Sequence, residues 1–225
     1  MPVNLNRLER VTGWLALLTL AMAVILLGNP AFTSASFPPR GIPDPILGLQ
    51  MARNVAEVDD VLGEAPSPDR EAMRIKQYWD FGFIACYVCL YLALSVLMAR
   101  TFPQWTWLAV SMAICGLGAA VFDVIENLAI LRILDVKLNL TTQAMVDAIH
   151  HPSMIKWTLV FITLAILSAY FLRQDQWRMR AVGLVNAAAS VLGFVGLLAN
   201  ALIAWAAFLM LLGLIGTILI FFRLK

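Results

Sequence analysis

Long stretches without charged residues recur along this chain, and the longest comprises residues 181–222. A helix crosses the hydrocarbon core of a bilayer with about 20 apolar residues. This stretch of 42 residues is therefore long enough for two spans, and we divide it near Asn200 into a tight helical hairpin. Helices satisfy their backbone hydrogen bonds internally, as the bilayer interior requires. The stretch predicts membrane-spanning helices rather than a soluble fold.

Four more stretches have the length and hydropathy of single spans, namely residues 11–28, 78–99, 105–134 and 155–172. The first follows Arg7 and Arg10, as the apolar part of a signal peptide would. Its apolar run exceeds the roughly 7–15 residues of such a part, so we interpret it as an uncleaved span. The expected fold is all-α, a polytopic membrane helical bundle of about six spans in which residues 1–225 form a single domain.

Composition agrees with an integral membrane protein. Of the 225 residues, 61% are hydrophobic and 13% are charged, whereas soluble domains contain about 25% charged residues. The net charge of +2 argues against a nucleic-acid partner, because such binding needs a concentrated basic patch. Cys86 and Cys89 form a C-x-x-C pair inside a span, which favours buried structural thiols over a redox pair. The lipid bilayer is the expected partner, and oligomerisation is left open.

Basic residues near the span ends predict the orientation, because cytoplasmic loops carry an excess of Lys and Arg. With six spans, one side of the membrane collects Arg7, Arg10, Arg100, Arg173, Arg178, Arg180, Arg223 and Lys225. The other side holds segments 29–77 and 135–154, in which acidic residues outnumber basic ones. Both termini are therefore expected in the cytoplasm.

Segment 29–77 is expected to form a helical cap outside the membrane. Residues 37–45 are rich in proline and predict an extended stretch. Over residues 46–62, apolar side chains recur every three or four positions, which indicates an amphipathic helix. Ser67, Pro68 and Asp69 have the order of a helix start. A helix over residues 68–99 would be about 48 Å long, so it should project beyond the bilayer.

Three polar residues interrupt the apolar stretch 105–134, namely Asp123, Glu126 and Asn127. On a helix they occupy positions i, i+3 and i+4, so they share one face. A carboxylate in hydrocarbon costs at least about 2.5–3.5 kcal/mol on insertion scales. The chain must therefore bury, pair or use both acids. At about 1.5 Å per residue, Glu126 falls in the outer half of the bilayer and Asp123 near its midplane.

Other polar residues fall at a similar depth on neighbouring spans, and we expect them to form one intramembrane polar site. The site comprises Asp80, Tyr87, Asp123, Glu126, Asn127 and Lys156. Two structural interpretations stay open. In the first, Lys156 neutralises a carboxylate and Asn127 satisfies the remaining polar atoms by hydrogen bonds, in a polar knot that only fixes helix packing. In the second, Asp80 and Lys156 extend to the membrane surface.

His150 and His151 precede Pro152 at the start of the fourth span, and Asp147 lies three residues before His150. They are weak candidates for a metal site, because adjacent helical side chains diverge by about 100° and a third ligand must come from elsewhere. We favour interfacial histidines at a helix start and no metal. Trp157 fits an interface anchor, and the sequence identifies no cofactor.

Three motifs follow one another in the middle of the chain: Asp-Phe-Gly-Phe at 80–83 with Tyr87, Asp-Val-Ile-Glu-Asn-Leu-Ala-Ile-Leu-Arg at 123–132, and Ile-Lys-Trp at 155–157. With these motifs, residues 54–172 resemble a group of small uncharacterised bacterial multi-span membrane proteins that contain a D-x-x-E-N transmembrane motif. The resemblance implies a bacterial inner-membrane protein. It implies no activity.

Three functions are compatible with such a site. In the first, which we favour, the site binds or conducts a small polar or lipid-like ligand: the acids supply charge, Asn127 orients the ligand and Lys156 is the counter-ion. In the second, the protein is a membrane-embedded enzyme on a lipid-like substrate, with one carboxyl group as general acid or base and Lys156 stabilising negative charge. The sequence contains no nucleophile motif or phosphate loop in support of this second function. In the third, the protein is a structural or assembly partner.

Overall fold

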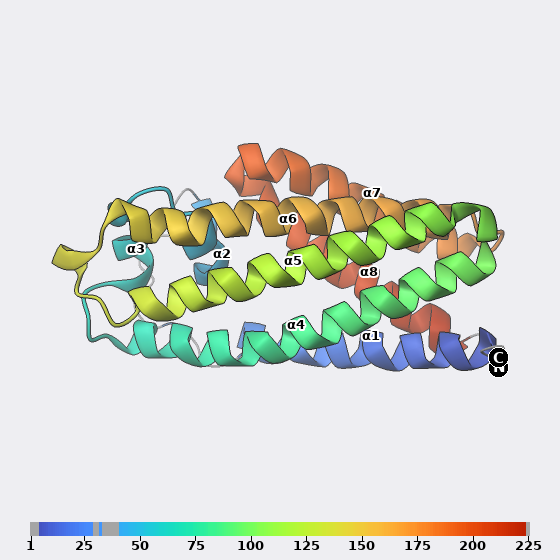
Figure 1. Ribbon diagram of the computed structural model, residues 1–225, viewed down its shortest axis with the longest axis horizontal. Helices are drawn as coiled ribbons and strands as arrows, with labels where there is room; N and C mark the ends of the chain where they lie inside the picture. Colours follow the sequence, from blue (N-terminus) through green and yellow to red (C-terminus); the bar gives the residue numbers. More distant parts are fainter. Residues whose placement is uncertain (1–4, 29–31, 33–40, 224–225) are drawn as a thin grey trace.

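The described residues, 5–28, 32 and 41–223 of a computed structural model, form an all-helical protein in which no residue lies in a strand. Six helices are long and apolar enough to cross a membrane (Figure 1). They are α1 (Leu5–Gly28), α4 (Pro68–Thr101), α5 (Thr106–Ile133), α6 (Gln143–Leu172), α7 (Trp177–Leu198) and α8 (Ile203–Arg223). The predicted multi-pass helical bundle is confirmed, including the division of residues 181–222 into two helices.

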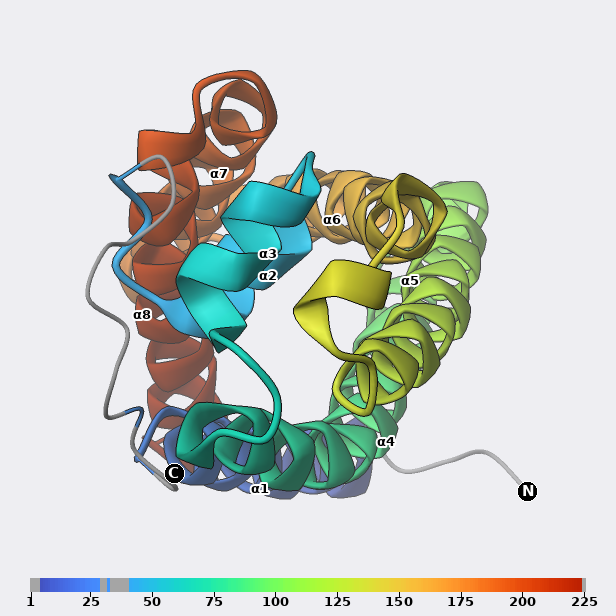
Figure 2. The ribbon, with the colours of Figure 1, turned by 90° about the vertical axis from the view of Figure 1, so that its left-hand side faces the viewer.

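The six long helices form a closed ring, because each packs against the next along the chain and α8 packs against α1 (Figure 2). Two short helices, α2 (Pro45–Met51) and α3 (Val55–Leu62), cover one end of the ring, which we call the capped end. Helix α1 begins and α8 ends at the opposite, uncapped end (Figure 1). Three short 3-10 turns lie in the connections: η2 (Pro103–Trp105), η3 (Leu138–Leu140) and η4 (Asn200–Leu202).

Helix α4 runs unbroken from Pro68 to Thr101, as the sequence predicts, and Ser67 caps its first turn by accepting a hydrogen bond from the Arg70 backbone N–H. At the capped end, two of its basic side chains serve other helices. The guanidinium of Arg70 donates to the carbonyl oxygens of Ile133, Leu134 and Val136, where α5 ends. The ammonium of Lys76 donates to the carbonyl oxygen of Leu26, where α1 ends. Positive charge is favourable at these helix C-termini, whose last carbonyl groups have no partner within the helix.

The cap differs from the predicted continuous helix over residues 46–62, because the chain breaks between α2 and α3. Asn54 accepts a hydrogen bond from the Glu57 backbone N–H, and the Glu57 carboxylate accepts one from the Arg53 backbone N–H. These local bonds compete with helix continuation and start a new helix. Residues 37–40 of the predicted proline-rich stretch, and Lys225, lie outside the described part of the chain.

Helix α6 begins at Gln143, well before the predicted fourth span, and it includes Pro152. Its extra turns bury Val146 and Ile149 against the cap and the end of α5, which explains why the helix starts early. His150 and His151 therefore lie within a helix, which corrects the expected helix start. The Cys86–Cys89 prediction is also wrong about burial, because Cys89 is exposed and Cys86 only partly buried.

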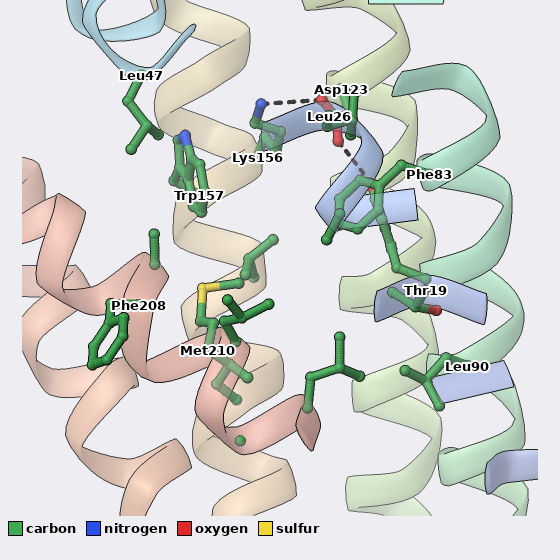
Figure 3. Close-up of a pocket in the computed structure, with 18 of the residues that line it drawn as sticks. Thr19, Leu26, Leu47, Phe83, Leu90, Asp123, Lys156, Trp157, Phe208 and Met210 are labelled. Atoms are coloured by element: carbon green, nitrogen blue, oxygen red, sulfur yellow. Dashed lines mark hydrogen bonds and ion pairs between the residues drawn. The ribbon is translucent and has the colours of Figure 1, made fainter. Parts of the chain in front are cut away.

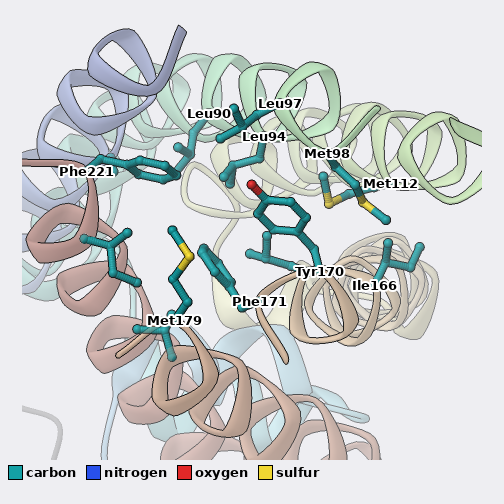
Figure 4. Close-up of a cluster of buried hydrophobic side chains, with 14 of the residues drawn as sticks. Leu90, Leu94, Leu97, Met98, Met112, Ile166, Tyr170, Phe171, Met179 and Phe221 are labelled. Atoms are coloured by element: carbon teal, nitrogen blue, oxygen red, sulfur yellow. The ribbon is translucent and has the colours of Figure 1, made fainter. Parts of the chain in front are cut away.

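Apolar side chains fill the interior of the ring at the uncapped end (Figure 4). They come from every helix of the ring, and the most deeply buried include Leu94, Met98, Met112 and Phe171. Close helix contacts use glycine: a Cβ on Gly193 would lie 2.2 Å from the ring of Phe161. Small residues of this kind permit membrane helices to approach closely. The ring is thus plugged at the uncapped end.

Candidate functional site

A cavity of about 460 Å³ lies inside the ring between this apolar plug and the cap. At one end of the cavity lie Lys156, Asp123 and Trp157, whereas Leu90 and Met210 line its deeper part (Figure 3). Most of the lining is apolar, and all six long helices and α2 contribute to it. The cavity therefore has a small polar end under the cap and a larger apolar end within the bundle.

Lys156 joins the two acids of α5. Its Nζ lies 3.0 Å from Asp123 Oδ1 and 2.7 Å from Glu126 Oε2. Lys156 is 4% exposed, Asp123 6% and Glu126 0%. The expectation that Lys156 extends to the membrane surface is therefore wrong, because its ammonium points inward to two buried carboxyl groups. Since burying a charge without a partner is costly, the three side chains depend on one another.

The remaining predicted site residues connect α4 to α5. The Tyr87 hydroxyl donates a hydrogen bond of 3.0 Å to Asp123 Oδ2. The Asn127 amide Nδ2 donates one of 2.6 Å to Asp80 Oδ2. All six residues proposed from the sequence thus lie under the cap in two hydrogen-bonded groups, Lys156 with Asp123, Glu126 and Tyr87, and Asn127 with Asp80, which we together call the polar network. Their common depth on three helices, together with the single face of Asp123, Glu126 and Asn127, was sufficient to identify them.

Three further residues of the network escaped sequence reasoning: Gln50, Ser153 and Trp157. Gln50 of α2 donates through Nε2 to Glu126 Oε1 at 2.7 Å and accepts a hydrogen bond from Trp157 Nε1 at 3.0 Å. The Ser153 hydroxyl lies 2.7 Å from Glu126 Oε2. Trp157 is therefore a cavity residue rather than the expected interface anchor. As a polar residue among the apolar residues of α2, Gln50 could have been recognised as a candidate, but the sequence did not indicate that it bonds Glu126 and Trp157.

Asp80 differs from the other acids of the network. It lines the cavity, and Asn127 is its hydrogen-bond donor. Within the described part of the chain, no Lys, Arg or His side chain forms an ion pair with it. The network thus contains three carboxyl groups and one ammonium group, and the ammonium is held by the other two acids.

The weak metal candidates do not gather into a site. The rings of His150 and His151 have centroids 6.0 Å apart. Asp147 accepts a hydrogen bond of 2.8 Å from the Gln143 amide on the same helix. Among residues 5–28, 32 and 41–223, no three His, Cys, Asp or Glu side chains are placed to hold a metal ion together.

The fold and its hydropathy define a multi-pass integral membrane protein with a polar network buried in its helical ring. Comparisons with protein-family models, with curated proteins and with solved structures find no match to this chain. Its function must therefore be argued from the cavity and from the residues that line it.

Proposed function

We propose that this protein binds a lipid-like amphiphile in the central cavity. The polar headgroup would lie under the cap, next to Asp80, Asp123 and Lys156, and the hydrocarbon part would lie among the apolar side chains deeper in the ring. The observation that carries the proposal is the two-part lining of the cavity. A volume of about 460 Å³ lies within the range of small-molecule sites, which is roughly 300–1,000 Å³.

A lateral route from the bilayer supports a lipid-like ligand. Helices α1 and α8 touch at the uncapped end, where a Cβ on Gly13 would lie 3.1 Å from Phe221 Cβ. They diverge toward the capped end in both views of the ribbon (Figures 1 and 2). There, Leu27 of α1 and Phe208 of α8 line the cavity, yet they are 63% and 50% exposed. Among the described residues, exposed side chains that line the cavity thus lie on both of these helices, and this supports entry of a lipid-like ligand from the bilayer.

The function favoured from the sequence was either binding or conduction of a ligand, and binding fits the structure better than conduction. A conducting path needs polar groups or water along its whole length. Below the cavity, however, apolar side chains such as Met98 and Phe171 fill the ring. A purely structural knot is also less favoured, because Asp80, Asp123 and Lys156 line an open space instead of being sealed by packing.

The distribution of charge supports a membrane location with the capped end outside the cytoplasm. Together with the resemblance to bacterial multi-span proteins, it leads us to place the protein in a bacterial inner membrane. The ligand would then enter from the outer leaflet.

Filling the cavity tests the proposal. Ala207 lines the cavity on α8, whereas Ala188 is exposed on α7 and does not line it. We expect lipid-like molecules to copurify with the wild-type protein and with Ala188→Trp, but to be lost from Ala207→Trp. Mass spectrometry of extracts from protein purified in nanodiscs measures this. Equal amounts of the same bound molecule in all three proteins, or a wild-type protein that retains none, would refute binding in the cavity.

A further inference from the structure

We infer that the preferred ligand carries a cationic headgroup, namely an alkylammonium amphiphile, and that Asp80 with the aromatic face of α4 is its recognition site. The inference rests on the proposed function and names the chemistry of the ligand. Two independent features of the cavity lead to it: the excess of carboxyl groups at its polar end and the aromatic rings beside them.

Charge balance at the polar end favours a cation. Asp123 and Glu126 share the ammonium of Lys156, at 3.0 and 2.7 Å. Asp80, in contrast, lines the cavity with an amide donor and, among the described residues, forms no close ion pair with a basic side chain. A carboxylate removed from water is stabilised by an opposite charge close to it. An ammonium headgroup next to Asp80 would supply that charge from the ligand.

Aromatic rings line the cavity from its polar end inward. Phe83, Tyr87 and Tyr91 follow Asp80 on one face of α4, at i+3, i+7 and i+11, and all three line the cavity. The ring centroids of Phe83 and Tyr87 are 5.4 Å apart, and those of Tyr87 and Tyr91 are 5.7 Å apart. Aromatic faces attract ammonium groups, most strongly where the cation is removed from water. The hydrogen bond from Tyr87 to Asp123 holds the middle ring in place.

An anionic headgroup is disfavoured by the same arrangement. It would meet the carboxyl groups of Asp80 and Asp123, and Lys156, the one cation of the network, is already held between Asp123 and Glu126. Arg70 and Lys76 do not line this cavity, and both are engaged at the ends of other helices. A neutral headgroup such as an alcohol would find hydrogen-bond partners but would supply no positive charge to the carboxyl groups that outnumber Lys156.

The experiment compares probes with one chain and different headgroups. Dodecyltrimethylammonium and dodecyl sulfate below their micelle-forming concentrations, and 1-dodecanol below its solubility limit, are added to the full chain in nanodiscs of neutral lipid. Native mass spectrometry then counts one-to-one adducts. We expect the wild-type protein to bind the ammonium probe at least about tenfold more tightly than the alcohol. The sulfate should bind most weakly.

Variants assign the preference to named residues. Asp80→Asn should remove the preference for the ammonium probe while alcohol binding is kept. Asp60→Asn, which changes an exposed acid of the cap, should leave both unchanged. If Asp80→Asn does not fold, Phe83→Leu provides a second test, because it keeps the carboxylate and removes an aromatic face. It should reduce the preference several-fold.

The outcomes separate the inference from the proposed function. Equal binding of the alcohol and the ammonium probe, both blocked by Ala207→Trp, would overturn the cationic headgroup and leave cavity binding intact. An ammonium preference that survives both Asp80→Asn and Phe83→Leu would also overturn the assignment. Binding of no probe, or binding that Ala207→Trp does not affect, would count against the cavity as a ligand site.

Discussion

Replacing Lys156 with Met removes the one ammonium of the buried network while keeping most of the volume of the side chain. Asp123 and Glu126 then face each other without their cation, at positions that are 6% and 0% exposed. No other basic residue is within ion-pair distance of either acid among the described residues. The substitution therefore isolates the contribution of one counter-ion.

Two interpretations of Lys156 predict different magnitudes. If it formed only ordinary hydrogen bonds between helices, at an average of about 0.6 kcal/mol each, losing two of them would cost about 1 kcal/mol. If it is the counter-ion of two buried carboxylates, its loss should cost about 3–5 kcal/mol, because the remaining charges stay uncompensated. At about 1.4 kcal/mol per factor of ten, the second value raises the unfolded fraction by roughly a hundred- to a few thousand-fold.

Reversible unfolding in mixed micelles, followed by helical circular dichroism, measures the free energy of unfolding. The combined variant Asp123→Asn, Glu126→Gln and Lys156→Met should recover most of the loss, because removing all partners together leaves no unpaired charge. Lys137→Met, at an exposed position in the connection between α5 and α6, should stay within about 0.5 kcal/mol of the wild type. A loss of about 1 kcal/mol or less for Lys156→Met, without recovery in the combined variant, would refute the counter-ion role.

Three other substitutions test the packing around the site. Gln50→Leu should weaken the attachment of α2 to the ring, because Glu126 and Trp157 lose their hydrogen bonds to Gln50 at a cost of about 1–3 kcal/mol. Amide hydrogen exchange in the cap should then be faster, and unchanged exchange would show that these hydrogen bonds do not hold α2 in place. Arg70→Leu should increase exchange at the end of α5 by removing the donor to its last carbonyl groups, whereas Arg74→Leu, which loses exposed ion pairs, should not. Gly193→Ala should destabilise the protein by about 1–3 kcal/mol, because a Cβ there overlaps the ring of Phe161. A free energy of unfolding equal to that of the wild type would show that α6 and α7 can move apart at no cost.

Hydropathy alone was sufficient to predict the spans, because each must cross a bilayer of known thickness. The hairpin near Asn200 followed from length, and the unbroken α4 followed from the start signal at Ser67. The start of α6 was not predictable in this way. It depends on contacts that Val146 and Ile149 make with residues of the cap, and those residues are far away in the sequence. The break before α3 was not predictable either. Side-chain hydrogen bonds of Asn54 and Glu57 end one helix and start another there, although the apolar residues keep the spacing of a single helix.

The residues of the candidate site could be predicted from the sequence, but which of them form hydrogen bonds or ion pairs with one another could not. Polar residues at one depth in apolar helices must find one another, which is why Asp123, Glu126 and Lys156 were identified together. Which acid takes which partner depends on helix rotation, and rotation is set by packing. The cavity was not predictable either, because it results from where the apolar plug ends. Gln50 belongs to the site only because α2 turns over the ring.

That position of Gln50 connects the cap to the headgroup site. Its amide bonds Glu126 on one side and Trp157 on the other, and Glu126 also holds Lys156. Breaking the Gln50 contacts would leave an indole N–H and a carboxylate oxygen without partners in a nearly dry interior, which is costly. On the proposed function, entry sideways between the described parts of α1 and α8 would leave these hydrogen bonds intact, whereas entry through the cap would break them. A cap that stays in place would keep water from the polar end and so strengthen the attraction between Asp80 and the proposed cationic headgroup.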